Sequence, residues 1–104
     1  MPIIKFSGVS EQQVIDFSNK VDEIAQLIVA DPTKIMFICE NSKIFQKNKQ
    51  QNPIYVTVEW MSRPDKEELF ANYITDFFNE FSDKVWVFFT EVNNKLFAHK
   101  KRVG

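Results

Sequence analysis

The chain has 104 residues, of which 44% are hydrophobic and 26% charged, and its formal net charge is −1. This length suits one domain with one core, and the small net charge does not favour nucleic acid as a partner. The single cysteine, Cys39, excludes an internal disulfide, and no apolar run is long enough to span a membrane. We therefore expect a cytoplasmic protein with no membrane partner. Eleven phenylalanines against two glycines predict an aromatic core with few flexible linkers.

The first half of the chain predicts a strand, a helix and a second strand. Residues 2–6 (PIIKF) are typical of a short strand, and a capping-box pattern at Ser10 and Gln13 opens a helix over 11–29. Residues 34–40 (KIMFICE) predict a strand covered on both faces, which NSKIFQ either continues or follows by re-entering the sheet. The apolar face of the helix consists of Val14, Phe17, Val21, Ile24 and Ile28.

The second half repeats this order. Residues 47–52 are a polar loop, and residues 53–60 (PIYVTVEW) alternate cleanly between apolar and other side chains, as a half-buried strand does. Pro64 and the acids around it open a second helix with a long stripe of aromatic residues. Residues 84–92 (KVWVFFTEV) predict the last strong strand, and residues 93–104 form a tail with a basic end.

These elements predict a single domain over 1–104, made of β-α-β units at 2–41 and 53–92 and the tail at 93–104. Each unit should be a right-handed crossover between parallel strands. Joining the units gives an α/β two-layer sandwich with a mixed sheet of four or more strands and two helices on one face. Strands this apolar do not suit a solvent-exposed face, so we expect a second copy of the chain to cover the other face.

The start MPIIKF, the long helix, the second strand and the internal β-α-β duplication together resemble the tautomerase superfamily, which includes oxalocrotonate tautomerase and macrophage migration inhibitory factor. The stretch MPIIKFSGVSEQQV, the VTVEW strand and Arg63 look like a small, mostly bacterial family of uncharacterised tautomerase-like proteins. The similarity spans roughly residues 2–92. It implies a duplicated β-α-β fold, assembly as a homotrimer or homodimer, and an N-terminal proline as general base in a pocket made partly by a neighbouring subunit.

Two interpretations of Pro2 stay open. Proline is tolerated at the first residue of a strand, so Pro2 can simply mark the start of the strand. If Met1 is removed, Pro2 becomes a free secondary amine, and apolar surroundings lower the pKa of such an amine. A neutral amine can carry a proton from one atom of a keto or enol acid to another, which is tautomerisation. While Met1 is attached, the Pro2 nitrogen is an amide with no usable lone pair.

The resemblance implies that the substrate would be a small α-keto or enol carboxylic acid. Arg63 is the best candidate for a clamp on its carboxylate, and Lys34 precedes the second strand, where macrophage migration inhibitory factor has a lysine near its pocket. Tyr55 and Trp60 are candidates for lining the pocket. Each has a plain alternative, a solvated charge for the cations and a core or interface anchor for the aromatics. The early part of the first helix has no arginine like that of oxalocrotonate tautomerase, which leaves the substrate class open.

We expect no cofactor and no metal. His99 and Cys39 offer no metal-ligand spacing, and two glycines cannot form a phosphate-binding loop. Two functions therefore remain: a tautomerase-like enzyme with Pro2 as its base, and a catalytically silent oligomeric module that has the same fold. A nucleic-acid partner is disfavoured by the net charge.

Overall fold

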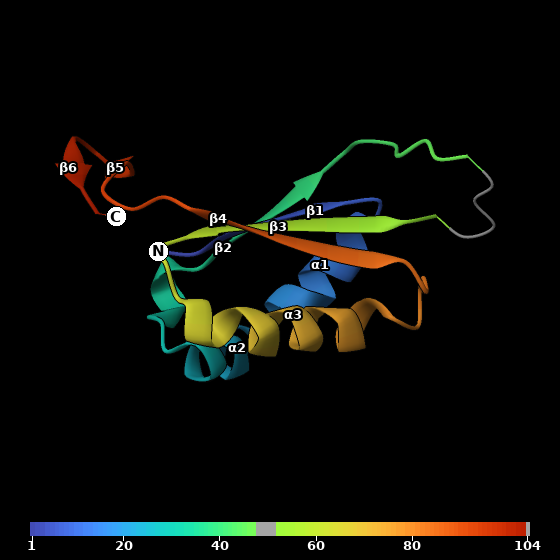
Figure 1. The fold of residues 1–104 in the computed structure, drawn as a ribbon, viewed down its shortest axis with the longest axis horizontal. Helices are drawn as coiled ribbons and strands as arrows, with labels where there is room; N and C mark the ends of the chain where they lie inside the picture. The colour runs from blue at the N-terminus through green and yellow to red at the C-terminus, as the bar shows by residue number, and fades with distance from the viewer. Residues whose placement is uncertain (48–51, 104) are drawn as a thin grey trace.

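The computed structural model describes residues 1–47 and 52–103, so most of the polar loop predicted at 47–52 lies outside the described residues (Figure 1). The elements in chain order are β1 (Ile3–Ser7), α1 (Glu11–Ser18), α2 (Val21–Ile28), the 3₁₀ turn η1 (Pro32–Lys34), β2 (Met36–Glu40), β3 (Ile54–Trp60), α3 (Pro64–Phe78), β4 (Val85–Glu91), β5 (Phe97–Ala98) and β6 (Lys101–Arg102).

A four-stranded mixed sheet organises the fold. Its strand order is β2-β1-β3-β4, with β1 parallel to β2, β3 parallel to β4, and β1 antiparallel to β3 between them. The predicted duplicated β-α-β arrangement is confirmed. The helices α1, α2 and α3 lie on one face of this sheet, and no described helix covers the opposite face, which we call the open face (Figure 1).

The core lies between the sheet and the helices. Alternation along β3 buries Ile54, Val56, Val58 and Trp60 against the helices, because successive side chains of a strand point to opposite faces. Phe17 of α1 is fully buried at the centre of an aromatic cluster. Its ring centroid lies 5.1–6.0 Å from those of five rings, and several of these pairs have the edge-to-face geometry that aromatic quadrupoles favour. The five rings belong to Phe6, Phe37, Tyr73, Phe77 and Phe78.

The helix expected over 11–29 is interrupted after Ser18 and becomes α1 and α2. The Ser18 hydroxyl donates to the Ile15 carbonyl at 2.7 Å, a local bond that competes with the helix ladder and bends it. The Lys20 N–H then bonds to the Phe17 carbonyl, three residues back instead of four. The break lets two short helices present separate apolar faces to the core.

Further differences from expectation concern β2, the segment that follows it and the tail. β2 begins at Met36, not at residue 34, because Asp31 caps the turn η1 by accepting the Thr33 N–H at 2.9 Å. β2 is also an edge strand, and Met36 is half exposed on the open face, so it is not covered on both faces as predicted. Residues 41–46 form no strand, and the tail contains the short hairpin β5–β6.

Tyr73 joins α3 to α2 and should make stability depend on pH. Its hydroxyl donates to Glu23 Oε1 at 2.8 Å, and burial, this hydrogen bond and the Glu23 charge raise the pKa of Tyr73 to about 12. An unfolded tyrosine ionises near pH 10. The contribution of Tyr73 to stability is therefore complete below about pH 10 and declines as the pH rises towards about 12.

Urea unfolding over a pH series checks this prediction. The difference in the free energy of unfolding between the wild type and Tyr73→Phe should be constant below about pH 10. Above that pH the wild type should lose stability relative to the variant, because the variant has no phenol to ionise. A difference that stays constant through the alkaline range would contradict the prediction.

Candidate active site at the chain N-terminus

The strand pairing places the N-terminus beside the end of β3. Ile3 pairs with Glu59 in the antiparallel ladder, so Pro2 lies opposite Trp60. The Pro2 carbonyl accepts the Met36 N–H at 3.0 Å, and the Pro2 side chain is fully buried. Pro2 is thus held between β2 and β3, and the chain N-terminus lies next to the connection from β3 to α3 (Figure 1).

Arg63 and Lys34 bring two positive charges to this end of the sheet. Arg63 directly precedes α3, and its guanidinium carbon lies 5.8 Å from the centroid of the Trp60 ring. Lys34 ends the turn η1, just before β2. Burial lowers the pKa of the Met1 α-amine, and the charges of Arg63 and Lys34 lower it further. Both predicted cations therefore act on the amine at the start of the chain.

This arrangement suits a base that works on an anion. A depressed amine pKa increases the fraction of neutral amine near neutral pH, and only the neutral amine has a lone pair to accept a proton. The same two cations would attract a substrate carboxylate and stabilise negative charge that develops on the oxygen next to it.

The two predicted aromatic site residues lie far apart. Trp60 is fully buried and stacks on Phe70 and Phe89, with ring centroids 5.9 and 5.0 Å away. Its indole N–H has no hydrogen-bond partner among the described residues. Tyr55 is five residues earlier on β3, about 17 Å along the strand, and is 39% exposed on the open face. Within one chain, the structure gathers Pro2, Arg63, Lys34 and Trp60 and leaves Tyr55 apart.

Sequence reasoning missed the backbone that holds Arg63. Arg63 Nη1 donates to the carbonyls of Ile28 and Val29 at 2.8 and 3.3 Å. These carbonyls belong to the end of α2, where the last turn of a helix leaves carbonyls without partners. The Asp31-Pro32 pair signals that a helix ends nearby, but no sequence pattern indicates which side chain its carbonyls will bind.

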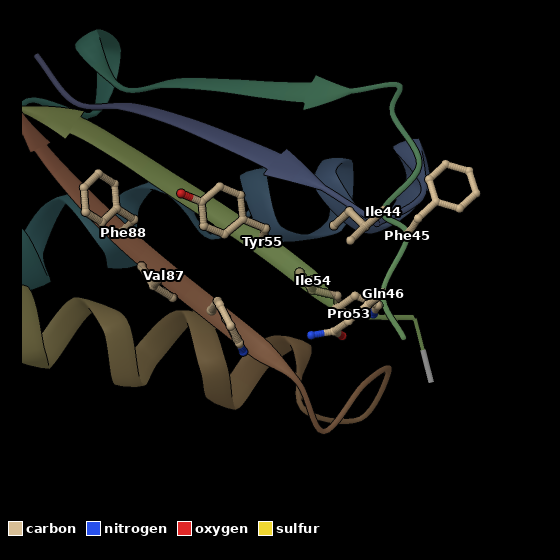
Figure 2. A pocket seen from close by; sticks show the side chains of 9 residues that line it. Ile44, Phe45, Gln46, Pro53, Ile54, Tyr55, Val87 and Phe88 are labelled. Atoms are coloured by element: carbon tan, nitrogen blue, oxygen red, sulfur yellow. The ribbon is translucent and has the colours of Figure 1, made fainter. Parts of the chain in front are cut away.

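An apolar hollow of about 550 Å³ lies away from the amine, at the other end of β3 and β4 (Figure 2). Tyr55 of β3 pairs with Trp86 of β4, and Phe88 lies two residues further along β4 (Figure 2). Among the described residues the lining contains no charged side chain, so it offers no cation to a carboxylate. It is lined by Ile44, Phe45, Gln46, Pro53, Ile54, Tyr55, Trp86, Val87 and Phe88.

The structure describes residues 1–47 and 52–103. In these residues no helix is both long and apolar enough to cross a membrane. The same residues contain no group of three or more His, Cys, Asp or Glu side chains that could hold a metal ion.

The family model of DUF1904, a domain of unknown function, matches residues 1–102. The chain belongs to the DUF1904 family. None of the curated proteins compared with this DUF1904 chain matches it.

Solved structures show the same fold. The crystal structure of a DUF1904 domain from Sebaldella termitidis has a TM-score of 0.86 at 20% identity, covering 99% of this chain and 100% of that one. Macrophage migration inhibitory factor from Oncomelania hupensis has a TM-score of 0.76 at 16% identity, covering 99% and 83%. N1, a member of the cis-3-chloroacrylic acid dehalogenase family, has a TM-score of 0.76 at 11% identity, covering 98% and 83%. The DUF1904 chain therefore has the fold of the tautomerase superfamily, as its sequence indicated.

Proposed function

We propose that this DUF1904 protein is a tautomerase-like enzyme for a small α-keto or enol carboxylic acid, with Pro2 as general base after removal of Met1. The observation that supports this most is the environment of the Met1 α-amine, whose pKa is lowered first by burial and then by the charges of Arg63 and Lys34. Removal of Met1 would transfer the amine to the adjacent Pro2. The fold relationship to the tautomerase superfamily agrees with it, although fold alone does not establish activity.

The proposed step is an isomerisation with no net change in atoms or electrons. The neutral Pro2 nitrogen takes the proton from the enol oxygen and leaves an enolate. An electron pair of that oxygen then forms the C=O bond while the electron pair of the C=C bond takes the same proton from Pro2 at carbon. Arg63 holds the substrate carboxylate, and Lys34 stabilises the oxygen while it carries negative charge. Trp60 forms the apolar floor below Arg63.

Intact mass followed by a turnover assay tests the proposal. We expect the untagged protein to lack one methionine and to speed the conversion of phenylpyruvate enol to its keto form. The matched control is the same chain with Met1 still attached, whose Pro2 nitrogen is an amide and should not act. A processed protein that turns over no enol acid would refute the proposal, and equal rates in both forms would refute Pro2 as the base.

A catalytically silent module is the second candidate, and Arg63 is the observation that favours it. Its hydrogen bonds to the Ile28 and Val29 carbonyls connect the start of α3 to the end of α2, which is a structural role. On this alternative, neither Pro2 nor Arg63 would affect the conversion of any enol acid.

We propose self-association through the open face for either function. Trp86 is 61% exposed, Phe88 56% and Tyr55 39%, and neighbouring aromatics this exposed mark an interaction surface. A second copy of the chain is the occupant that the resemblance implies, in a homotrimer or homodimer.

Light scattering after size-exclusion chromatography should give a multiple of 12.3 kDa. Trp86→Glu combined with Phe88→Lys should shift the protein to the monomer, because charges would be buried in an apolar contact. Leu69→Glu is the matched control, since Leu69 is 45% exposed but lies on α3, away from the open face. A wild type that is monomeric at every concentration would contradict self-association.

A further inference from the structure

Arg63 is anchored by one end of its guanidinium only. Nη1 donates to the two carbonyls at the end of α2, and Nη2 and Nε donate to no acceptor among the described residues. The guanidinium carbon lies over the Trp60 ring, 5.8 Å from its centroid, which is within the range of cation–π attraction. A planar fork fixed at one nitrogen keeps its charge and has remaining donors for a ligand.

The carbonyls that anchor Arg63 lie at a residue with an unusual backbone conformation, Val29, and at the residue before it. Val29 has φ 57° and ψ 61°, the left-handed region that a β-branched residue rarely adopts. Its side chain is 71% exposed, so side-chain packing does not force this conformation. The turn ends α2 and leads the chain towards η1, with the Ile28 and Val29 carbonyls both within reach of Nη1.

We propose that Val29 is a positioning residue of the candidate active site: its left-handed turn aims the Ile28 and Val29 carbonyls at Arg63 and fixes the guanidinium over Trp60, beside the chain N-terminus. This inference rests on the proposed function, in which Arg63 lowers the pKa of the amine and holds the substrate carboxylate. A guanidinium fixed before the substrate arrives loses less conformational entropy on binding.

The connection from α2 to β2 also carries the second cation. Five residues after Val29, the Lys34 N–H bonds to the Asp31 carbonyl at 3.0 Å and closes the turn η1. Two residues later, the Met36 N–H bonds to the Pro2 carbonyl at 3.0 Å. One short segment therefore fixes Arg63, carries Lys34 and holds Pro2.

The position of Arg63 can be followed without any substrate through the pKa of the Met1 α-amine, which burial and the charge of Arg63 lower. This pKa can be measured from the pH dependence of labelling by an amine-reactive reagent, followed by mass spectrometry. Val29→Gly keeps the left-handed conformation, because glycine adopts positive φ freely, and is the matched control. Val29→Pro cannot adopt it, because proline holds φ near −65°. Each variant is measured alone and together with Arg63→Gln.

We expect Val29→Pro to raise the amine pKa towards its ordinary value by as much as Arg63→Gln does, and Val29→Gly to leave it unchanged. In the Arg63→Gln background, Val29→Pro should add no further shift, because both changes remove the same charge from the same place. An additive shift, or no shift from Val29→Pro in a folded protein, would overturn the proposal.

NMR of the wild type and of Val29→Gly keeps the proposal testable if Val29→Pro does not fold. We expect separate, exchange-protected signals for the Arg63 Nη1 protons in both proteins, and averaged, unprotected signals would overturn the proposal. Enol turnover is not part of either measurement. A protein that converts no enol acid would thus refute the proposed function and leave the positioning result unaffected.

Discussion

Replacing Phe17 by alanine should lower the free energy of unfolding by about 3–5 kcal/mol. Phe17 is fully buried and contacts rings from the sheet and from α3, so no single neighbour can move in to fill the space. The truncation removes both the transfer free energy of the ring and the contacts around the cavity it leaves. The free energy of unfolding of a domain of this size is only about 5–15 kcal/mol, so the variant should be marginally stable.

Urea unfolding at fixed protein concentration measures this effect, because self-association would otherwise add to the apparent stability. The matched control is Leu69→Ala, which truncates an apolar residue that is 45% exposed and should cost much less. Equal losses in the two variants would contradict the assignment of Phe17 to the centre of the core.

Replacing Pro2 by alanine in the protein that lacks Met1 should reduce the rate of enol conversion by about 10²–10⁴-fold, the usual contribution of a positioned acid–base group. The Pro2 ring is fully buried and its carbonyl is bonded to the Met36 N–H, so the proline nitrogen has one fixed position. An alanine leaves a primary amine that can rotate and that is no longer enclosed by the ring. The base then spends less time in the reactive geometry.

Lys84→Gln is the control for this variant. Lys84 directly precedes β4, at the end of the sheet away from Pro2, and its loss should leave the rate unchanged. The rate is followed by the absorbance of the enol, with circular dichroism to show that the alanine variant is folded. An unaltered rate in Pro2→Ala would favour another base or the catalytically silent module.

Local patterns in the sequence determined most of the fold. The alternation of PIYVTVEW predicts β3 and the face that it buries, and it already puts Tyr55 and Trp60 on opposite faces of the sheet. The spacing of Val14, Phe17 and Ile24 predicts helical faces that the structure buries. These signals are readable because strand and helix periods are properties of neighbouring residues. The hydroxyl bond of Ser18 that breaks the helix is also local, but there the Ser18 hydroxyl and the Asn19 N–H share the Ile15 carbonyl as acceptor.

The candidate site was predictable residue by residue but not as an arrangement. Pro2, Arg63 and Lys34 are visible as chemical types, whereas their meeting depends on the antiparallel pairing of β1 with β3 and on the turn after α2. Arg63 is bonded to carbonyls 34 and 35 residues earlier in the chain. Backbone carbonyls are present at every residue, so only the tertiary structure decides which of them meets a given guanidinium. The sequence by itself determined the periodic elements, and folding decided which charges surround the N-terminal amine.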